Sequence, residues 1–174
     1  MTTFRSILAG GIGLLIIALG TGCASYRLGP TSGLEAGAQS ISVHPFPNKT
    51  IEPGLSPAVA TAMRRHIQSD GTFTLNTKNK GDIDLTGEIV SYQRVGVSFQ
   101  PNDIITIRDF ELRMTAEIKA VNRRSREVIL AESVTGTTLI RAFDDLASAE
   151  RQALPLLAND LAQKATDLLV DGKW

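Results

Sequence analysis

The sequence predicts an α+β fold: a two-layer sandwich in which about four mostly antiparallel strands form a sheet and two helices pack on one face. Strict alternation of apolar and polar residues over 109–120 is typical of a strand with one buried and one solvated face. Apolar residues also recur at helical spacing over 59–67 and 154–168. Because each pattern leaves a single apolar face, the helices and the sheet need one another as covering layers.

The first predicted elements are a short strand and a helix. Alternation over 41–44 predicts the strand, and the proline-rich residues 45–48 end it. Ser56 and Pro57 are typical of an N-cap followed by the first helical residue. The helix then carries an apolar stripe and ends at Asp70-Gly71. The stripe consists of Val59, Met63 and Ile67.

Several strands follow this helix. Phe73 and Leu75 predict a short one, and alternation continues over 83–89 and again over 95–99. A glycine within a strand often marks a bulge, so we expect one at Gly87 or Gly96. Residues 100–103 then predict a loop.

The clearest strand is 109–120, followed by a turn at 122–126 and a returning strand over 128–140. One face of the clearest strand is apolar and the other is charged or polar, which predicts a solvated outer face for the sheet. The apolar face holds Phe110, Leu112, Met114, Ala116, Ile118 and Ala120. The other face holds Asp109, Glu111, Arg113, Thr115, Glu117 and Lys119.

A long helix closes the chain. Asp144 and Asp145 place negative charge at its positive end, and Pro155 predicts a kink or a restart inside it. The predicted order is therefore strand, helix, four strands and helix, or close to it. The apolar stripe of this last helix is Leu154, Leu157, Leu161, Ala165 and Leu168.

Composition excludes several functions. The 174 residues include 18 Lys+Arg and 18 Asp+Glu, so the formal net charge is zero, which argues against a nucleic acid partner. One Cys allows no intrachain disulfide and no multi-cysteine metal site. The two histidines, His44 and His66, leave little material for a metal centre, and surface or half-buried positions explain both. We expect no cofactor.

The N-terminal residues predict export and lipidation. Residues 7–20 form an uncharged apolar stretch, shorter than the about 20 residues of a membrane span. This stretch, followed by Gly20-Thr21-Gly22 and Cys23, resembles a bacterial lipobox, although the usual Leu three residues before the Cys is one position early here. A cleaved soluble export signal and an uncleaved anchor are the alternatives. The only Cys of the chain directly follows the apolar stretch, which favours lipidation.

The predicted domains follow from this N-terminus. Residues 1–22 are a lipoprotein signal peptide, 23–40 are the lipidated Cys and a flexible tether rich in Gly, Ser and Ala, and 41–174 are the α+β domain. Residues 24 and 25 are Ala and Ser rather than Asp, which by resemblance to bacterial sorting rules directs the protein to the outer membrane.

No catalytic arrangement is visible in the sequence. It contains neither a G-x-S-x-G elbow nor a glycine-rich phosphate loop, and the strand carboxylates are explained by a solvated face. We therefore predict that the protein is not an enzyme. The densest positive cluster is the turn with Arg123, Arg124 and Arg126, which are candidate contacts for a phosphorylated lipid. The alternative is a solvated turn neutralised by Glu127 and Glu132.

Several segments together resemble the LptE family, the outer-membrane lipoproteins of lipopolysaccharide assembly. Each segment is weakly specific, but their order and spacing cover nearly the whole chain after the predicted signal peptide. They are ISVHPFPNKT at 41–50, EPGL at 52–55, the helix from 59 to GTF at 71–73, DLTGEI at 84–89, Tyr92, Arg94, ERQALP at 150–155 and LANDLA at 157–162.

This resemblance implies a lipoprotein that sits inside the large β-barrel LptD, helps it fold, plugs its lumen and contacts lipopolysaccharide. The predicted partners are thus an LptD-like barrel, lipopolysaccharide and the membrane. A further hypothesis places the lipidated tether and the arginine turn at opposite ends of the domain. The alternatives are a lipoprotein activator of a peptidoglycan synthase or a secretion-pore subunit, and a hydrolase if a clustered acid-base pair exists.

Overall fold

The computed structural model describes residues 36–100, 103–141 and 145–172, and the predicted signal peptide and Cys23 lie outside these ranges. Within them, the predicted order of strands and helices is confirmed, and the sheet has five strands rather than about four. The elements are β1 (Gln39–Val43), α2 (Leu55–Asp70), β2 (Phe73–Leu75), β3 (Ile83–Gln100), β4 (Asp103–Asn122), β5 (Val128–Arg141) and α3 (Leu146–Val170).

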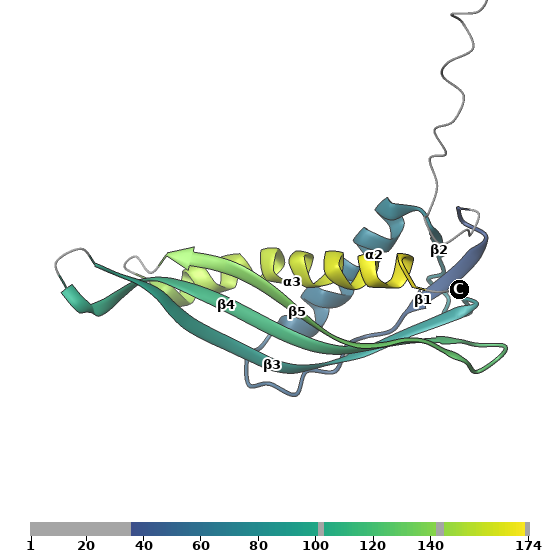
Figure 1. Cartoon of the computed structure of the whole chain (residues 1–174), viewed down its shortest axis with the longest axis horizontal. Coiled ribbons are helices and arrows are strands. Elements are labelled where there is room, and N and C mark those ends of the chain that lie inside the picture. The colour runs from purple at the N-terminus through teal and green to yellow at the C-terminus, as the bar shows by residue number, and fades with distance from the viewer. Residues whose placement is uncertain (1–35, 101–102, 142–144, 173–174) are drawn as a thin grey trace, which may run out of the picture.

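The sheet is mixed, with the strand order β2-β1-β3-β4-β5 (Figure 1). β1 runs parallel to both β2 and β3, whereas β3, β4 and β5 are antiparallel neighbours. β1 and β2 can be parallel neighbours because α2 connects them, and adjacent parallel strands need such a crossover. The sheet is therefore a long antiparallel meander with a small parallel unit attached to one edge.

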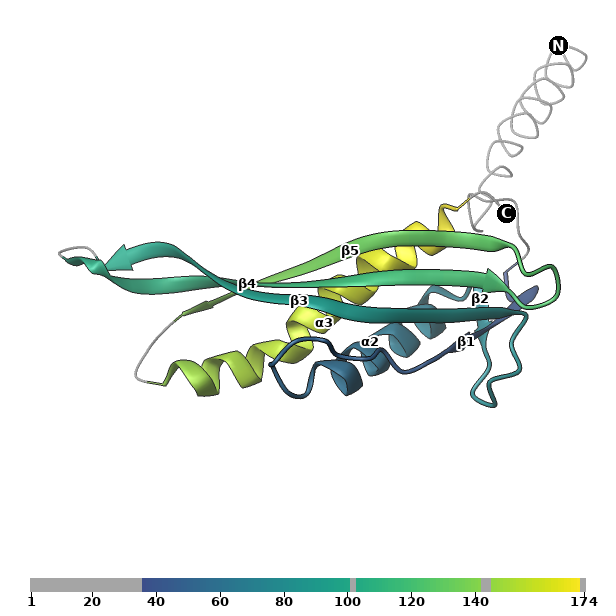
Figure 2. The same cartoon turned by 90° about the horizontal axis from the view of Figure 1, so that it is seen from below.

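The two alternating stretches of the sequence form one long strand, β3. Its register against β4 shifts between Gly96 and Ser98, which confirms a bulge at Gly96. Gly87 pairs in regular register instead, and a Cβ there would lie 2.2 Å from the buried ring of Phe46, so this glycine allows a close approach. β3 and β4 extend beyond the other elements as a hairpin (Figure 2).

Both helices lie on the same face of the sheet, which confirms the two-layer sandwich (Figures 1 and 2). α3 packs against β5 and β4, and α2 packs against α3 and the β1–β2 pair. The apolar face predicted for β4 is turned inward, with Leu112 through Ala120 buried at alternate positions and Phe110 partly buried. The opposite face of the sheet has no helix over it in the described chain.

The helix ends and stripes differ in detail from the predictions. Gly54, in the left-handed region at φ 82°, caps α2 instead of Ser56, because Leu55 already begins the helix and is buried. α3 continues through Pro155, which cannot donate to the carbonyl of Arg151, and both residues are exposed. Leu169 is buried and Leu168 is exposed, because the stripe continues from Leu161 and Ala165 at intervals of four residues.

The domain has two ends. The proximal end holds the start of β1, the 76–82 loop and the 122–127 turn. The distal end holds the last residues of β3, the first residues of β4 and the start of α3. The backbone N–H of Arg123 donates to the carbonyl of Asp82, and the side chain of Asp82 accepts from Ser40, which joins these proximal segments. In the part of the chain that is described, no helix is long and apolar enough to cross a membrane.

Candidate functional site

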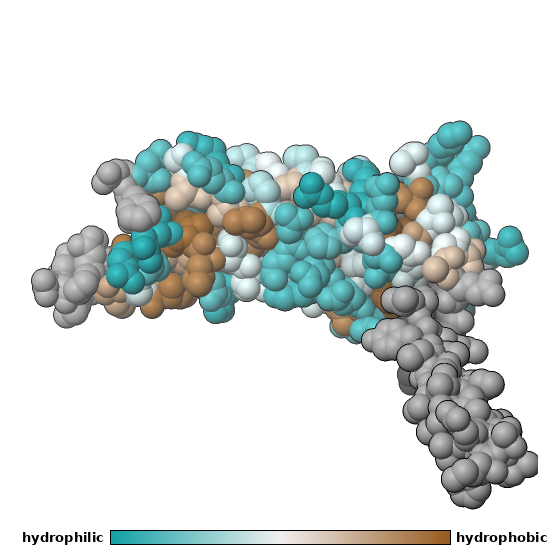
Figure 3. All heavy atoms as spheres, turned by 90° about the horizontal axis from the view of Figure 1, so that it is seen from above, coloured by the Kyte–Doolittle hydropathy of each residue, from teal (hydrophilic) through white to brown (hydrophobic). Residues whose placement is uncertain are grey.

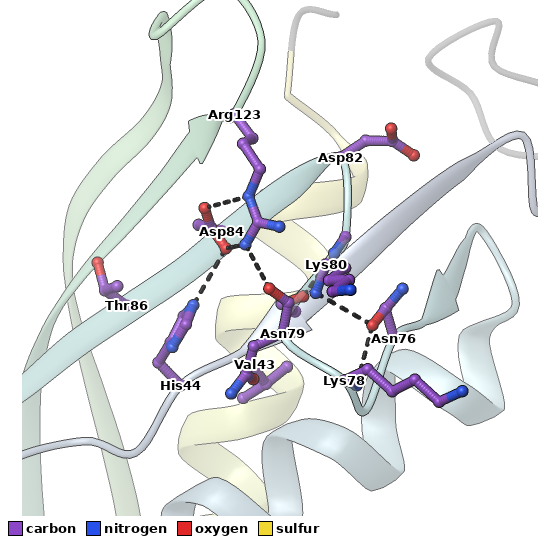
Figure 4. Close-up of polar contacts among 12 residues, drawn as sticks. Val43, His44, Asn76, Lys78, Asn79, Lys80, Asp82, Asp84, Thr86 and Arg123 are labelled. Atoms are coloured by element: carbon purple, nitrogen blue, oxygen red, sulfur yellow. Dashed lines mark hydrogen bonds and ion pairs between the residues drawn. The ribbon is translucent and has the colours of Figure 1, made fainter.

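The arginine turn lies at the proximal end, against the loop that precedes β3 (Figure 4). Arg123 donates from Nε to Asp84 Oδ2 at 2.9 Å and from Nη2 to Asp84 Oδ1 at 2.5 Å. Nη2 also donates to the carbonyl of Asn79 at 2.8 Å. His44 Nε2 lies 3.1 Å from the same Asp84 Oδ1. Asp84 therefore holds three segments of the chain together.

The charges in this cluster stabilise one another. The Arg123 guanidinium lowers the pKa of Asp84, with a smaller contribution from the His44 hydrogen bond, although partial burial acts in the opposite direction. Asp84 in turn raises the pKa of Arg123. Because Nε and Nη2 of the guanidinium are both hydrogen-bonded to Asp84, Arg123 links the turn to β3. The two residues are 39 positions apart in the sequence.

The other two arginines of the turn are exposed. Their backbone N–H groups donate to Asn122, that of Arg124 to the side-chain oxygen and that of Arg126 to the backbone carbonyl. Arg126 adopts a positive φ of 63°. Arg124 borders a groove of about 410 Å³ that Lys80 and Asp82 also line. Arg123 lines it as well, so the groove combines three cations with one carboxylate. Phosphate contact by these arginines stays a prediction.

Asp82 ties the groove to the beginning of the domain. The hydroxyl of Ser40 donates to Asp82 Oδ2 at 2.7 Å, and the Ser40 N–H donates to the same oxygen at 3.0 Å. These two hydrogen bonds lower the pKa of Asp82. The last residues of the predicted tether, 36–40, therefore lie beside the arginine turn. The hypothesis that tether and turn occupy opposite ends is wrong for these residues.

Two of the acidic residues predicted on the solvated face, Asp109 and Glu111, are engaged with cations or hydroxyls. Asp109 accepts from Ser98, from Arg141 at 2.8 Å and from Arg108 at 2.9 Å, and these groups hold its pKa below its ordinary value. Glu111 pairs with Arg113. Such solvated ion pairs explain these carboxylates without acid-base chemistry. Within the described residues, no group of three or more His, Cys, Asp or Glu side chains could hold a metal ion.

The open face of the sheet is polar toward the proximal half. A groove of about 570 Å³ crosses β3, β4 and β5 there, and Glu88, Glu117 and Lys119 line it. Lys49 forms an ion pair with Glu88 at 3.0 Å. Glu88 on β3 lies directly opposite Glu117 on β4. Both histidines are half-buried, as predicted, and lie outside this groove.

The distal half is more apolar. The exposed fractions are 37% for Val95, 45% for Val97 and 51% for Phe99 on β3, and 68% for Leu139 on β5. On the face seen in Figure 3, hydrophobic surface also gathers toward the end that carries the β3–β4 hairpin, and hydrophilic surface covers much of the middle. The sequence patterns show these residues as alternating strand positions but do not reveal that they remain uncovered.

Comparison with known proteins places the domain in a family. The LptE family model, described as lipopolysaccharide-assembly, matches residues 38–170. This match includes every strand and helix of the described chain. Among the curated proteins, none matches the chain significantly.

Solved structures share the fold at low sequence identity. A Xanthomonas campestris protein has a TM-score of 0.56 at 9% identity, with 84% of this chain and 92% of that chain covered. A Chlamydia trachomatis protein has a TM-score of 0.53 at 8% identity, covering 76% and 94%. A minor lipoprotein of Acinetobacter baumannii has a TM-score of 0.50 at 13% identity, covering 75% and 91%. At these identities the likeness establishes the fold alone.

Proposed function

The chain belongs to the LptE family of lipopolysaccharide-assembly proteins, and on that premise we propose that it is an outer-membrane lipoprotein that binds and plugs an LptD-like β-barrel. The observation that carries this proposal is the family match over residues 38–170. The role requires binding rather than bond chemistry, so we propose that the protein is not an enzyme and needs no cofactor.

The open face of the sheet supports a position inside a barrel. The lumen of a transmembrane barrel is polar, because strands alternate lipid-facing apolar residues with polar ones inside. Glu88, Glu117 and Lys119 on the proximal half of this face offer charges of both signs. Paired charges at such an interface give specificity and register more than affinity.

Lipidation of Cys23 is the proposed anchor to the membrane, after removal of residues 1–22. Each buried CH₂ of an acyl chain contributes about 0.8 kcal/mol, and two or more chains give stable attachment. We predict that Cys23→Ala releases the protein from washed membranes of cells that lack the barrel, and immunoblotting of the fractions measures this. Continued sedimentation with the membranes would contradict the lipid anchor.

Lipopolysaccharide contact is proposed for Arg124 and Arg126, which are exposed at the arginine turn. Arg123 contributes indirectly, because its ion pair with Asp84 holds the turn in place. Guanidinium groups bind phosphate through two parallel hydrogen bonds, and lipid A carries such phosphates. The turn lies beside residues 38–40 at the start of the described domain, so we propose that the contact is made at that end of the domain.

The proposed function is tested by affinity purification of the tagged, full-length protein from detergent-solubilised envelope, followed by mass spectrometry. The expected result is recovery of one large outer-membrane barrel. Recovery of a peptidoglycan synthase, or of a ring made only of this chain, would favour the alternative functions. An untagged strain and a strain with a tagged, unrelated lipoprotein are the matched controls.

A further inference from the structure

We propose that the outer edge of β3, from Val90 to Phe99, is a docking site for an extended segment of the barrel partner, which adds to the sheet as a further strand. The inference rests on the proposed function and deepens it. A closed barrel has no free strand edges of its own, so the added strand comes from a loop of the barrel protein that enters the lumen.

The edge of β3 is paired only in its first part. β1 pairs with β3 from Ile83 to Leu85, and the chain that follows β1 stays beside β3 as far as Ile89. The N–H of Lys49 donates to the Ile89 carbonyl at 2.9 Å, and the Ile89 N–H donates to the Pro47 carbonyl at 2.8 Å. Beyond Ile89, no described strand pairs with this edge. Its backbone donors and acceptors are therefore open to another strand.

The opposite edge of the sheet is treated differently. On β5, the N–H of Thr137 donates to Asp160 of α3 at 2.7 Å, and Lys164 of α3 donates to the Thr135 carbonyl at 3.1 Å. Lys164 also pairs with Asp160 at 2.7 Å, so the two side chains form one clamp over this edge. The fold thus blocks the middle of the β5 edge and leaves the distal part of the β3 edge unblocked.

The composition of the open edge favours a polypeptide strand as its occupant. Natural edge strands are protected against pairing by Pro, Lys, inward-pointing charges or bulges, and here the bulges lie on either side of the regular stretch Ser91–Gly96. The segment 91–99 has no Pro, Lys or acidic residue, and Arg94, its one charge, is paired with Glu150 of α3 at 2.5 Å. Val95, Val97 and Phe99 are exposed along it. An added strand would cover these side chains and satisfy the backbone groups together.

The register shifts of β3 define the length of the proposed pairing. They occur between Ile89 and Ser91, between Gly96 and Ser98, and at the two further steps from Ser98 to Gln100. They leave Ser91–Gly96 as the regular part of the edge, which matches the length of an ordinary strand. A bare apolar hairpin is unfavourable in a polar lumen, because apolar surface left in water forgoes the stabilisation that burial gives. A strand from the partner removes this conflict at the distal end.

The test places Lys at Val95 and Val97 together in the tagged, full-length protein and measures how much barrel copurifies. Leu139→Lys is the matched control, because Leu139 lies on the same face at the other edge and is more exposed than either valine. We expect the double variant to lower recovery of the barrel by about tenfold, as loss of an interface anchor does. We expect the control to keep it within about twofold.

Photo-crosslinking and thermal unfolding complete the design. A photoreactive residue at Val95 should crosslink to a loop of the barrel protein in intact cells, and the melting temperature of the double variant should equal that of the wild type. Unchanged recovery in the double variant, equal loss in the Leu139 control, or crosslinks joining two copies of this chain would each overturn the inference and leave the proposed function standing. Absence of any barrel with the wild-type chain would overturn the proposed function itself.

Discussion

Asp84 has the most consequential side chain at the proximal end, because it engages Arg123 and His44 at once. A carboxylate between a guanidinium and an imidazole can accept a hydrogen bond from each, and the hydrogen bond from the guanidinium is charge-assisted. The result is a turn fixed to the sheet through side chains. It is this fixed turn from which Arg124 and Arg126 project.

We predict that Asp84→Asn lowers the free energy of unfolding by about 1 kcal/mol at pH 7, since the pair is partly exposed and solvent screens it. The pKa of Asp84 is lowered in the folded chain, so its contribution is complete above the ordinary value of 3.8 and is lost as the pH falls further. Urea unfolding from pH 7 to pH 3 should therefore show wild type and variant converging at the acidic end.

Glu127→Gln is the control for this experiment, because Glu127 is exposed in the same turn and its side chain has no ion pair among the described residues. It should leave the unfolding free energy unchanged across the same pH range. A difference between wild type and Asp84→Asn that is independent of pH would contradict the ionic explanation.

Packing of the last helix on the sheet depends on Gly136 of β5. A Cβ there would lie 2.7 Å from the Cβ of Leu161 and 2.8 Å from the carbonyl oxygen of Leu157, both on α3. The alanines of the α3 stripe, Ala158 and Ala162 among them, are buried beside this contact. Small residues on both elements therefore let the helix approach the strand closely.

We predict that Gly136→Ala destabilises the domain by about 1–3 kcal/mol, because the added methyl group meets helix backbone that has no room to move. Gly96→Ala is the matched control, since its methyl group would meet side-chain atoms of Ile107 and no backbone, and the nearest of them, at 2.7 Å, is the terminal Cδ1. Chemical denaturation of both variants measures the difference. Equal stability of the two variants would show that α3 does not depend on this approach.

Periodicity in the sequence predicts which face of a single strand or helix is buried, but it does not predict which other elements pair with or pack against that element. Alternation in β4 identified its buried face, and Val59, Met63 and Ile67 identified that of α2, because a period of two or of 3.6 is a local property. The short β1 shows only Ile41 and Val43, which do not reveal parallel pairing with two strands. The sequence predicts Leu168 as the last residue of the α3 stripe, but Leu169 is the buried one, because spacings of three and of four residues after Ala165 both fit the pattern.

The candidate site was predictable in part for the same reason. The arginine turn is visible as a cluster in sequence, but the engagement of Arg123 depends on Asp84, which is 39 residues away. The open edge of β3 is invisible in sequence, because it depends on where the chain after β1 leaves the sheet at Ile89. Long-range pairing of this kind is set by the tertiary fold and not by local pattern.

The whole molecule is polarised along its length. The proximal end gathers the start of the domain, the arginine turn and mixed charge, whereas the distal end presents exposed apolar side chains and an unpaired strand edge. In the proposed complex, the lipid anchor and the proximal end lie near the membrane leaflet, and the distal hairpin reaches into the barrel. Each end then meets surroundings that suit its chemistry.

The measurement that tests this account most directly is native mass spectrometry of the tagged protein purified from outer membranes in mild detergent. The account predicts a complex of one copy of this chain, carrying its acyl chains, with one barrel protein. A homo-oligomer of this chain, or a monomer with an unmodified cysteine and no barrel, would contradict it.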